Sequence, residues 1–71
     1  NNPVETMFWN ILEKNLKQRV EDSDMLYEVG LNSISAIHML SEFKNAGLNV
    51  STRNMLSAKT VKELRLLVCG A

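Results

Sequence analysis

The sequence has few of the residues on which disulfide scaffolds, many-turned β folds and nucleic-acid binders depend. Its single cysteine, Cys69, cannot form a disulfide within the chain, which excludes a disulfide scaffold and predicts a reducing, cytoplasmic location. Three glycines and one proline supply few turns for a fold of many short strands. Eight basic and eight acidic residues give a formal net charge of zero, whereas nucleic-acid binders usually have a basic excess.

Long apolar runs are missing as well. No run approaches the roughly 20 residues needed to cross a bilayer, and no charged-then-apolar segment resembles a signal peptide. We therefore expect neither a membrane partner nor a nucleic-acid partner. The 71 residues, of which 45% are hydrophobic and 23% charged, instead predict one small globular domain spanning residues 1–71.

Apolar residues spaced three and four apart predict two long helices. The first is expected over residues 4–20, after Pro3, with an apolar stripe made of Val4, Met7, Phe8, Ile11, Leu12 and Leu16. The second is expected over residues 33–46, and Gly47 supplies its stop. Ile34 lies at the margin of its core-facing arc, which comprises Ala36, Ile37, Met39, Leu40 and Phe43.

The remaining segments predict a long loop and two shorter helices. The loop, residues 20–32, contains four acids and no base, and we expect its apolar side chains to hold it to the core: Met25, Leu26, Tyr27 and Val29. Ser51 caps a short helical pattern over 51–56. Thr60 and Glu63 have capping-box spacing for a last helix with a stripe of Val61, Leu64, Leu67 and Val68. These elements predict an all-α fold, a four-helix bundle with three principal helices and one short one.

The sequence lacks a convincing catalytic or metal-binding set. His38 is the only histidine and lies within a helical pattern, and Cys69 has no nearby base or cation to activate it. One histidine and one cysteine cannot supply four zinc ligands, and Asp22 and Asp24 lack the twelve-residue calcium-loop pattern. We therefore expect no metal site and no enzyme activity in the isolated chain.

The segment Gly30-Leu31-Asn32-Ser33-Ile34 places a serine where the acidic loop meets the second long helix. The start of a helix presents free N–H groups and the positive end of the macrodipole, so an anion attached to the Ser33 hydroxyl is favoured there. Asn32 and Ser33 both suit the cap position. Two interpretations follow from the residues alone: Ser33 carries a phosphodiester, or Ser33 only caps the helix.

The residues around this serine resemble the phosphopantetheine-attachment motif of carrier proteins, which reads roughly aromatic-Glu-Leu-Gly-Gly-Asp-Ser-Leu before an amphipathic helix. The matching residues are Leu26-Tyr27-Glu28-Val29-Gly30-Leu31-Asn32-Ser33-Ile34-Ser35-Ala36. Gly47, residues 55–61 and Leu64 continue the resemblance, so that it spans about residues 6–68. Asn32 departs from the usual Asp or His, and Lys59 departs from the usual proline.

The resemblance implies an acyl-carrier-like bundle and a covalent 4'-phosphopantetheine as cofactor. A phosphopantetheinyl transferase would move this group from coenzyme A onto Ser33, with Asn32 as the flanking motif residue. The resemblance further implies that the attached group forms a flexible arm. The thiol at the end of this arm carries a thioester-bound intermediate between catalytic domains, and the carrier itself catalyses nothing.

The charge of the second long helix points to the carrier subclass. Glu42 and Lys44 cancel, whereas carriers of dissociated fatty-acid synthases have a strongly acidic helix there. The chain therefore resembles peptidyl carrier (thiolation) domains of nonribosomal peptide synthetases, in particular fungal ones. This resemblance implies adenylation, condensation and terminal cyclising domains as partners, docking on an apolar patch of Ile34, Ile37 and Leu56. Core packing is the alternative for Ile37 and Leu56.

The chain from Asn1 to Ala71 is expected to be one monomeric domain excised from a multidomain synthetase. Two other functions stay open at this point. One is an acyl carrier of a polyketide or fatty-acid type synthase. The other is a helical interaction module without a covalent arm.

Overall fold

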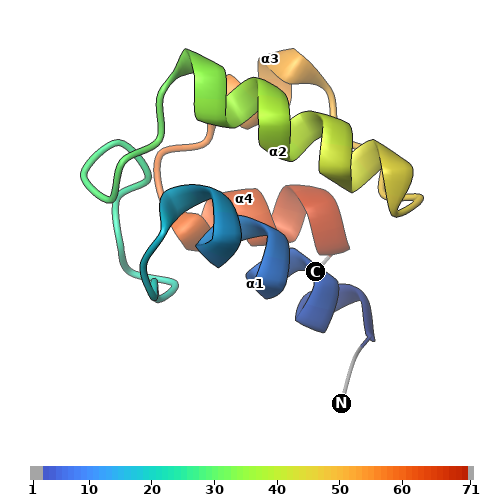
Figure 1. The fold of residues 1–71 in the computed structure, drawn as a ribbon, viewed down its shortest axis with the longest axis horizontal. Helices are drawn as coiled ribbons and strands as arrows, with labels where there is room; N and C mark the ends of the chain where they lie inside the picture. Colours follow the sequence, from blue (N-terminus) through green and yellow to red (C-terminus); the bar gives the residue numbers. More distant parts are fainter. Residues whose placement is uncertain (1–2, 71) are drawn as a thin grey trace.

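Four α-helices follow one another in the computed structural model, which describes residues 3–70 (Figure 1). They are α1 (Pro3–Leu16), α2 (Ser33–Asn45), α3 (Thr52–Ser57) and α4 (Val61–Cys69). Helix α1 packs against α2 and α4, and the short α3 packs against α2 and α4. The predicted all-α fold of three principal helices and one short helix is confirmed.

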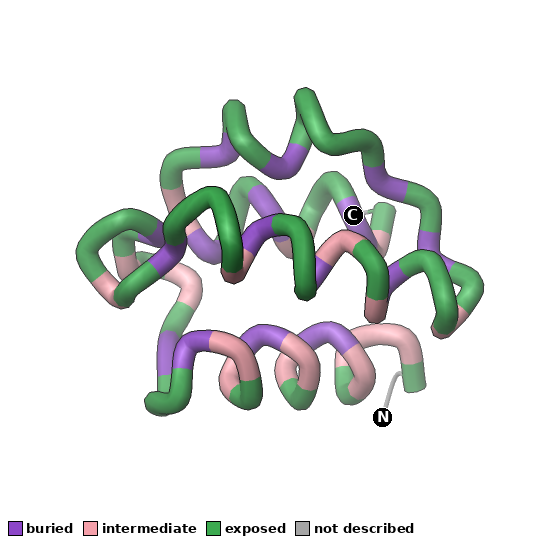
Figure 2. Tube along the Cα trace, turned by 45° about the horizontal axis from the view of Figure 1, so that its top comes forward, coloured by how far each residue is buried: buried purple, intermediate pink, exposed green. Residues whose placement is uncertain are grey.

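The core is built from apolar side chains of all four helices and of the loop between α1 and α2. Figure 2 shows the buried positions on the inward sides of the helices. The rings of Phe8 and Phe43 stack at its centre, with centroids 5.9 Å apart and planes inclined by 8°. No polar or charged residue is buried within residues 3–70. The largest fully buried side chains are Phe8, Phe43, Leu12, Leu26, Met39, Met55, Leu64 and Val61.

The first helix is shorter than predicted. It ends at Leu16 rather than Val20, because Lys17 adopts the left-handed conformation with φ of 61°. The Lys17 N–H still donates to the Glu13 carbonyl oxygen, at 2.7 Å, so the last turn closes before the chain leaves the helix. Val20 is buried, but it reaches the core from the loop.

The apolar faces of α2 and α4 are narrower than predicted. Ile37 is 61% exposed and Leu67 is 41% exposed, so neither belongs to the core, and Leu40 is only half-buried. At about 100° per residue, Ile37 is displaced by roughly 120° from Phe43, at the edge of the arc that neighbouring helices cover. Of the two interpretations for Ile37, core packing is therefore excluded, and the same holds for Leu56, which is 44% exposed.

Residues 17–32 form a loop at the end of the bundle where α1 ends and α2 and α4 begin (Figure 1, teal to green). Its backbone is hydrogen-bonded to the α3–α4 connection: Leu26 N–H donates to the Lys59 carbonyl at 2.9 Å, and Val61 N–H donates to the Asp24 carbonyl at 3.0 Å. An isolated β-bridge joins Met25 and Thr60. Of the residues predicted to hold the loop to the core, Leu26 is fully buried and Val29 half-buried, whereas Met25 and Tyr27 are exposed.

The predicted caps of α3 and α4 are present. Ser51 Oγ accepts from Asn54 N–H at 3.0 Å, and Thr60 Oγ1 accepts from Glu63 N–H at 3.2 Å. Gly47 ends α2 with φ of 83°, a conformation that favours glycine. No helix among residues 3–70 is long and apolar enough to span a bilayer.

Replacing Lys17 by glycine tests whether its left-handed backbone is strained. We expect Lys17→Gly to raise the free energy of unfolding by about 0.5–1 kcal/mol. The left-handed conformation costs a residue with Cβ roughly 1–2 kcal/mol, but glycine loses more conformational entropy on folding, which offsets part of the gain. Urea unfolding measures the change. Lys17→Ala is the control: it removes the ammonium but keeps Cβ, and a gain as large as that of Lys17→Gly would contradict the backbone explanation.

Candidate functional site

Asn32 caps the start of α2. Its backbone is extended, with φ of −144° and ψ of −179°, and its side-chain Oδ1 accepts from the N–H groups of Ile34 and Ser35, both at 2.9 Å. The same oxygen also accepts from the Ser35 hydroxyl at 3.1 Å. Two residues earlier, Gly30 turns the chain with φ of 108°, and a Cβ there would force a strained backbone. One amide oxygen therefore satisfies two of the free donors of the first turn.

Ser33 is the first residue of α2 and is exposed to solvent. Its hydroxyl forms no hydrogen bond with any residue of the described part of the chain, because Asn32 performs the capping. The interpretation in which Ser33 only caps the helix is therefore wrong. What remains at this position is a free, exposed hydroxyl group fixed at the tip of a thirteen-residue helix.

The electrostatic surroundings of Ser33 favour an anion. The N-terminus of α2 is the positive end of its macrodipole, and the first turn of α2 contains no acidic residue. The carboxylate of α2, Glu42, lies about 180° around the helix from Ser33 and faces α1. There it accepts hydrogen bonds from Lys14 Nζ at 3.0 Å and Asn15 Nδ2 at 2.9 Å. The bond from Asn15, followed by that from Lys14, lowers the pKa of Glu42.

Exposed apolar side chains accompany the serine. Ile34 follows it and is 67% exposed, and Ile37 lies about 40° around α2 from Ser33, on the same flank. This flank points away from α1, and α2 packs on α3 as well as on α1. Leu56 of α3 is also exposed, as are Met25 and Tyr27 of the loop. An apolar surface therefore adjoins the free hydroxyl.

The side chains that could act as a base or a nucleophile do not form a cluster with Ser33. His38 is exposed on α2, and Cys69 is half-buried at the end of α4, where burial raises the pKa of its thiol and so disfavours the nucleophilic thiolate. No cluster of three or more His, Cys, Asp or Glu side chains suited to a metal ion occurs within residues 3–70.

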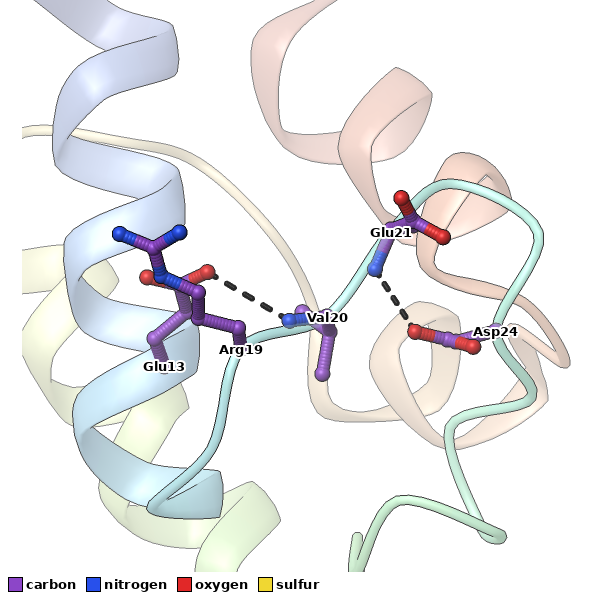
Figure 3. Close-up of a pocket in the computed structure, with 5 residues that line it drawn as sticks. All are labelled: Glu13, Arg19, Val20, Glu21 and Asp24. Atoms are coloured by element: carbon purple, nitrogen blue, oxygen red, sulfur yellow. Dashed lines mark hydrogen bonds between the residues drawn. The ribbon is translucent and has the colours of Figure 1, made fainter.

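A hollow of about 530 Å³ lies between the end of α1 and the following loop (Figure 3). Its lining residues are Glu13, Arg19, Val20, Glu21 and Asp24. Two of the carboxylates are engaged with the loop backbone: Glu13 Oε2 accepts from Val20 N–H at 3.4 Å, and Asp24 Oδ2 accepts from Glu21 N–H at 2.7 Å. These two bonds hold the loop that leads to α2.

Sequence patterns did not indicate one contact of the loop that leads to the serine. The Tyr27 hydroxyl donates to the Leu56 carbonyl oxygen at 3.0 Å, across 29 positions of the chain. Tyr27 makes this hydrogen bond and is exposed, in place of the predicted apolar contact with the core. A hydrogen bond between an exposed loop side chain and a distant helix end leaves no periodic signal.

Comparisons with known proteins agree with this geometry. Residues 8–68 match the family described as phosphopantetheine attachment site. Two curated proteins are similar to the chain: nonribosomal peptide synthetase 2 of Gibberella zeae, 33% identical over 54 residues, and nonribosomal peptide synthetase sidC of Arthroderma benhamiae, 27% identical over 55 residues. The alignments cover 76% and 78% of this chain but only 1% of each relative. No solved structure matches the chain.

The match leaves out only short stretches at the two ends of the chain and includes the predicted motif. The acyl-carrier-like resemblance is therefore confirmed at the level of the family and the fold. The cofactor of that family is 4'-phosphopantetheine, attached covalently. The chain belongs to the phosphopantetheine attachment site family and is a carrier domain.

Proposed function

We propose that Ser33 is the attachment residue and that the domain serves a nonribosomal peptide synthetase. The observation that carries the proposal is the free, exposed hydroxyl at the start of α2, next to a cap supplied entirely by Asn32. The residues present fit the group: the hydroxyl is accessible, and no carboxylate of the first turn repels a phosphodiester.

Attachment requires a phosphopantetheinyl transferase and coenzyme A. A bond forms between Ser33 Oγ and the phosphorus that bears the pantetheine, the pyrophosphate bond of coenzyme A breaks, and adenosine bisphosphate leaves. The hydroxyl proton passes to a base of the transferase. When attached, the group supplies a thiol on which aminoacyl or peptidyl intermediates are held as thioesters. Ser33 anchors this arm, Asn32 fixes the turn before it, and the chain supplies recognition rather than catalysis.

The two fungal relatives support the synthetase assignment, since both are nonribosomal peptide synthetases. We propose that the chain is one monomeric domain of such a synthetase and works in the cytoplasm. Its partners are adenylation, condensation and terminal cyclising domains. The outer side of α2 agrees, because Glu42 is turned toward Lys14 of α1 and leaves no acidic docking surface of the fatty-acid carrier type. An acyl carrier of a polyketide synthase is the second candidate, and the relatives favour it less.

The docking surface proposed for the transferase and for these domains comprises Ile34, Ile37 and Leu56. All three side chains are exposed, by 67%, 61% and 44%, although each is large and apolar. A modest apolar patch suits partners that must bind and release in turn, because transient interfaces are small. The patch flanks the proposed attachment residue, so a partner that covers it also reaches the arm.

Intact mass after incubation with coenzyme A and a broad-specificity phosphopantetheinyl transferase tests the attachment. We expect the wild type to gain the mass of one phosphopantetheine and Ser33→Ala to gain none, because the alanine lacks the nucleophilic oxygen. Ser35→Ala is the matched control: it removes a hydroxyl two residues after Ser33 and should be modified like the wild type. An unmodified wild type would instead support a helical interaction module without an arm.

A charge placed in the docking surface tests the partner contact. We expect Ile34→Asp to keep the fold, since Ile34 is exposed, and to lower kcat/KM for loading by the transferase about tenfold or more, since an unpaired carboxylate would be buried in the complex. The control is Leu66→Asp on α4, where Leu66 is 41% exposed and lies outside the proposed surface. Equal rates for the wild type and Ile34→Asp with every partner would refute the assignment.

Truncating Asn32 tests its role beside the serine. We expect Asn32→Ala to lower the free energy of unfolding by about 1 kcal/mol, the usual loss for an N-cap, while a saturating amount of transferase still modifies Ser33. Asn32→Asp keeps an acceptor oxygen and should lose less than about 0.5 kcal/mol. Thermal unfolding followed by circular dichroism reports both. An Asn32→Ala variant as stable as the wild type would show that the cap contributes nothing.

A further inference from the structure

The hydrogen bond from the Tyr27 hydroxyl to the Leu56 carbonyl joins two segments that the proposed function uses. Tyr27 lies in the loop that leads into Ser33, and Leu56 lies one residue before the end of α3. The oxygen-to-oxygen distance is 3.0 Å. The bond therefore links the loop of the proposed attachment residue to a helix that presents part of the proposed docking surface.

The bond meets a specific need of α3. The last carbonyl groups of a helix have no N–H four residues onward inside the helix, and α3 has only six residues. The Ala58 N–H donates to the Asn54 carbonyl at 3.2 Å, and the Ser57 hydroxyl donates to the same carbonyl at 3.0 Å. The Leu56 carbonyl instead receives the Tyr27 hydroxyl. A phenylalanine at position 27 would leave this carbonyl to water.

The loop on the other side of the bond is held in place. Leu26, next to Tyr27, is fully buried, and its N–H donates to the Lys59 carbonyl. The Leu31 N–H donates back to the Leu26 carbonyl at 2.9 Å, which closes the turn before Asn32. A hydrogen-bonded turn therefore connects Tyr27 to Ser33, and the hydroxyl of Tyr27 joins this turn to α3.

We propose that Tyr27 is a positioning residue: its hydroxyl ties the end of α3, and with it Leu56, to the loop that precedes Ser33, so that the phosphopantetheinyl transferase engages Leu56 and Ser33 in one docking event. This inference rests on the proposed function. Tyr27 is 55% exposed, so water competes for the bond and α3 is held only modestly. Loss of the hydroxyl should therefore weaken docking and leave the chemistry at the serine unchanged.

The test uses Tyr27→Phe, which keeps the ring and removes only the donor. In the apo protein we expect amide hydrogen exchange at Met55 and Ala58 to rise about three- to tenfold, while exchange in α2 stays unchanged, since one hydrogen bond of ordinary strength is lost. In loading by the transferase with coenzyme A, we expect KM for the carrier to rise about threefold or more and kcat to stay within about twofold.

A double-mutant cycle with Leu56→Ala separates positioning from direct contact. Because the bond goes to the backbone carbonyl, Leu56→Ala keeps it and removes only the side chain that is being positioned. If Tyr27 acts through Leu56, the effect of Tyr27→Phe on KM disappears in the Leu56→Ala background. A KM effect that persists undiminished there, or exchange in α3 that does not change, would overturn the proposal.

Failure of the proposed function would look different. It would appear as a wild type that the transferase does not modify, or as modification that survives Ser33→Ala. Tyr27→Phe that behaves like the wild type in exchange and in kinetics, while Ser33→Ala still abolishes modification, would overturn only the role of Tyr27.

Discussion

The chemistry available to this domain depends on which side chain caps α2. The side-chain oxygen of Asn32 accepts the N–H groups of Ile34 and Ser35, so the hydroxyl of Ser33 is not needed by the helix. A serine in the cap position would have its oxygen engaged with backbone donors. Its hydroxyl would therefore be a poorer nucleophile in the reaction that a transferase catalyses. Because the cap sits one residue earlier, the same helix end supplies both a fixed position and a free hydroxyl.

The rest of the bundle serves to hold that helix end still. The loop before α2 is fastened to the α3–α4 connection by backbone bonds, and Arg65 of α4 contacts both carboxylate oxygens of Asp22, at 3.0 and 3.1 Å. On the opposite flank, Glu42 ties α2 to α1 through Lys14 and Asn15. Two of the four acidic side chains of the loop, those of Asp22 and Asp24, are thus engaged in internal contacts. What the domain presents beside the serine is apolar, which suits a carrier that visits partners in turn.

Features that arise from neighbouring residues were predictable from the sequence. Helical periodicity predicted the long helices, and capping residues marked the starts of α3 and α4, because caps act over two or three residues. Ser51 and Thr60 cap these helices as predicted, whereas Asn32 was one of two candidates for the cap of α2. The serine itself was singled out from its place at a helix start and from the family motif. The structure adds that Asn32, and not Ser33, fills the cap.

Features that depend on distant contacts were not predictable in this way. The early end of α1 at Leu16 requires a left-handed lysine, which no periodic pattern indicates. The outward position of Ile37 follows from how much of α2 its neighbours cover, and this is a property of the assembled bundle. The bond between Tyr27 and Leu56 joins residues that come together only after folding, since 29 positions separate them.

Peptide mapping by tandem mass spectrometry, after reaction of the folded chain with coenzyme A and a phosphopantetheinyl transferase, identifies the residue that carries the phosphopantetheine. We expect one phosphopantetheine, located on Ser33, with Ser35 and the remaining serines unmodified. A phosphopantetheine located on any other residue would contradict the claim that the Asn32 cap leaves the Ser33 hydroxyl free for attachment.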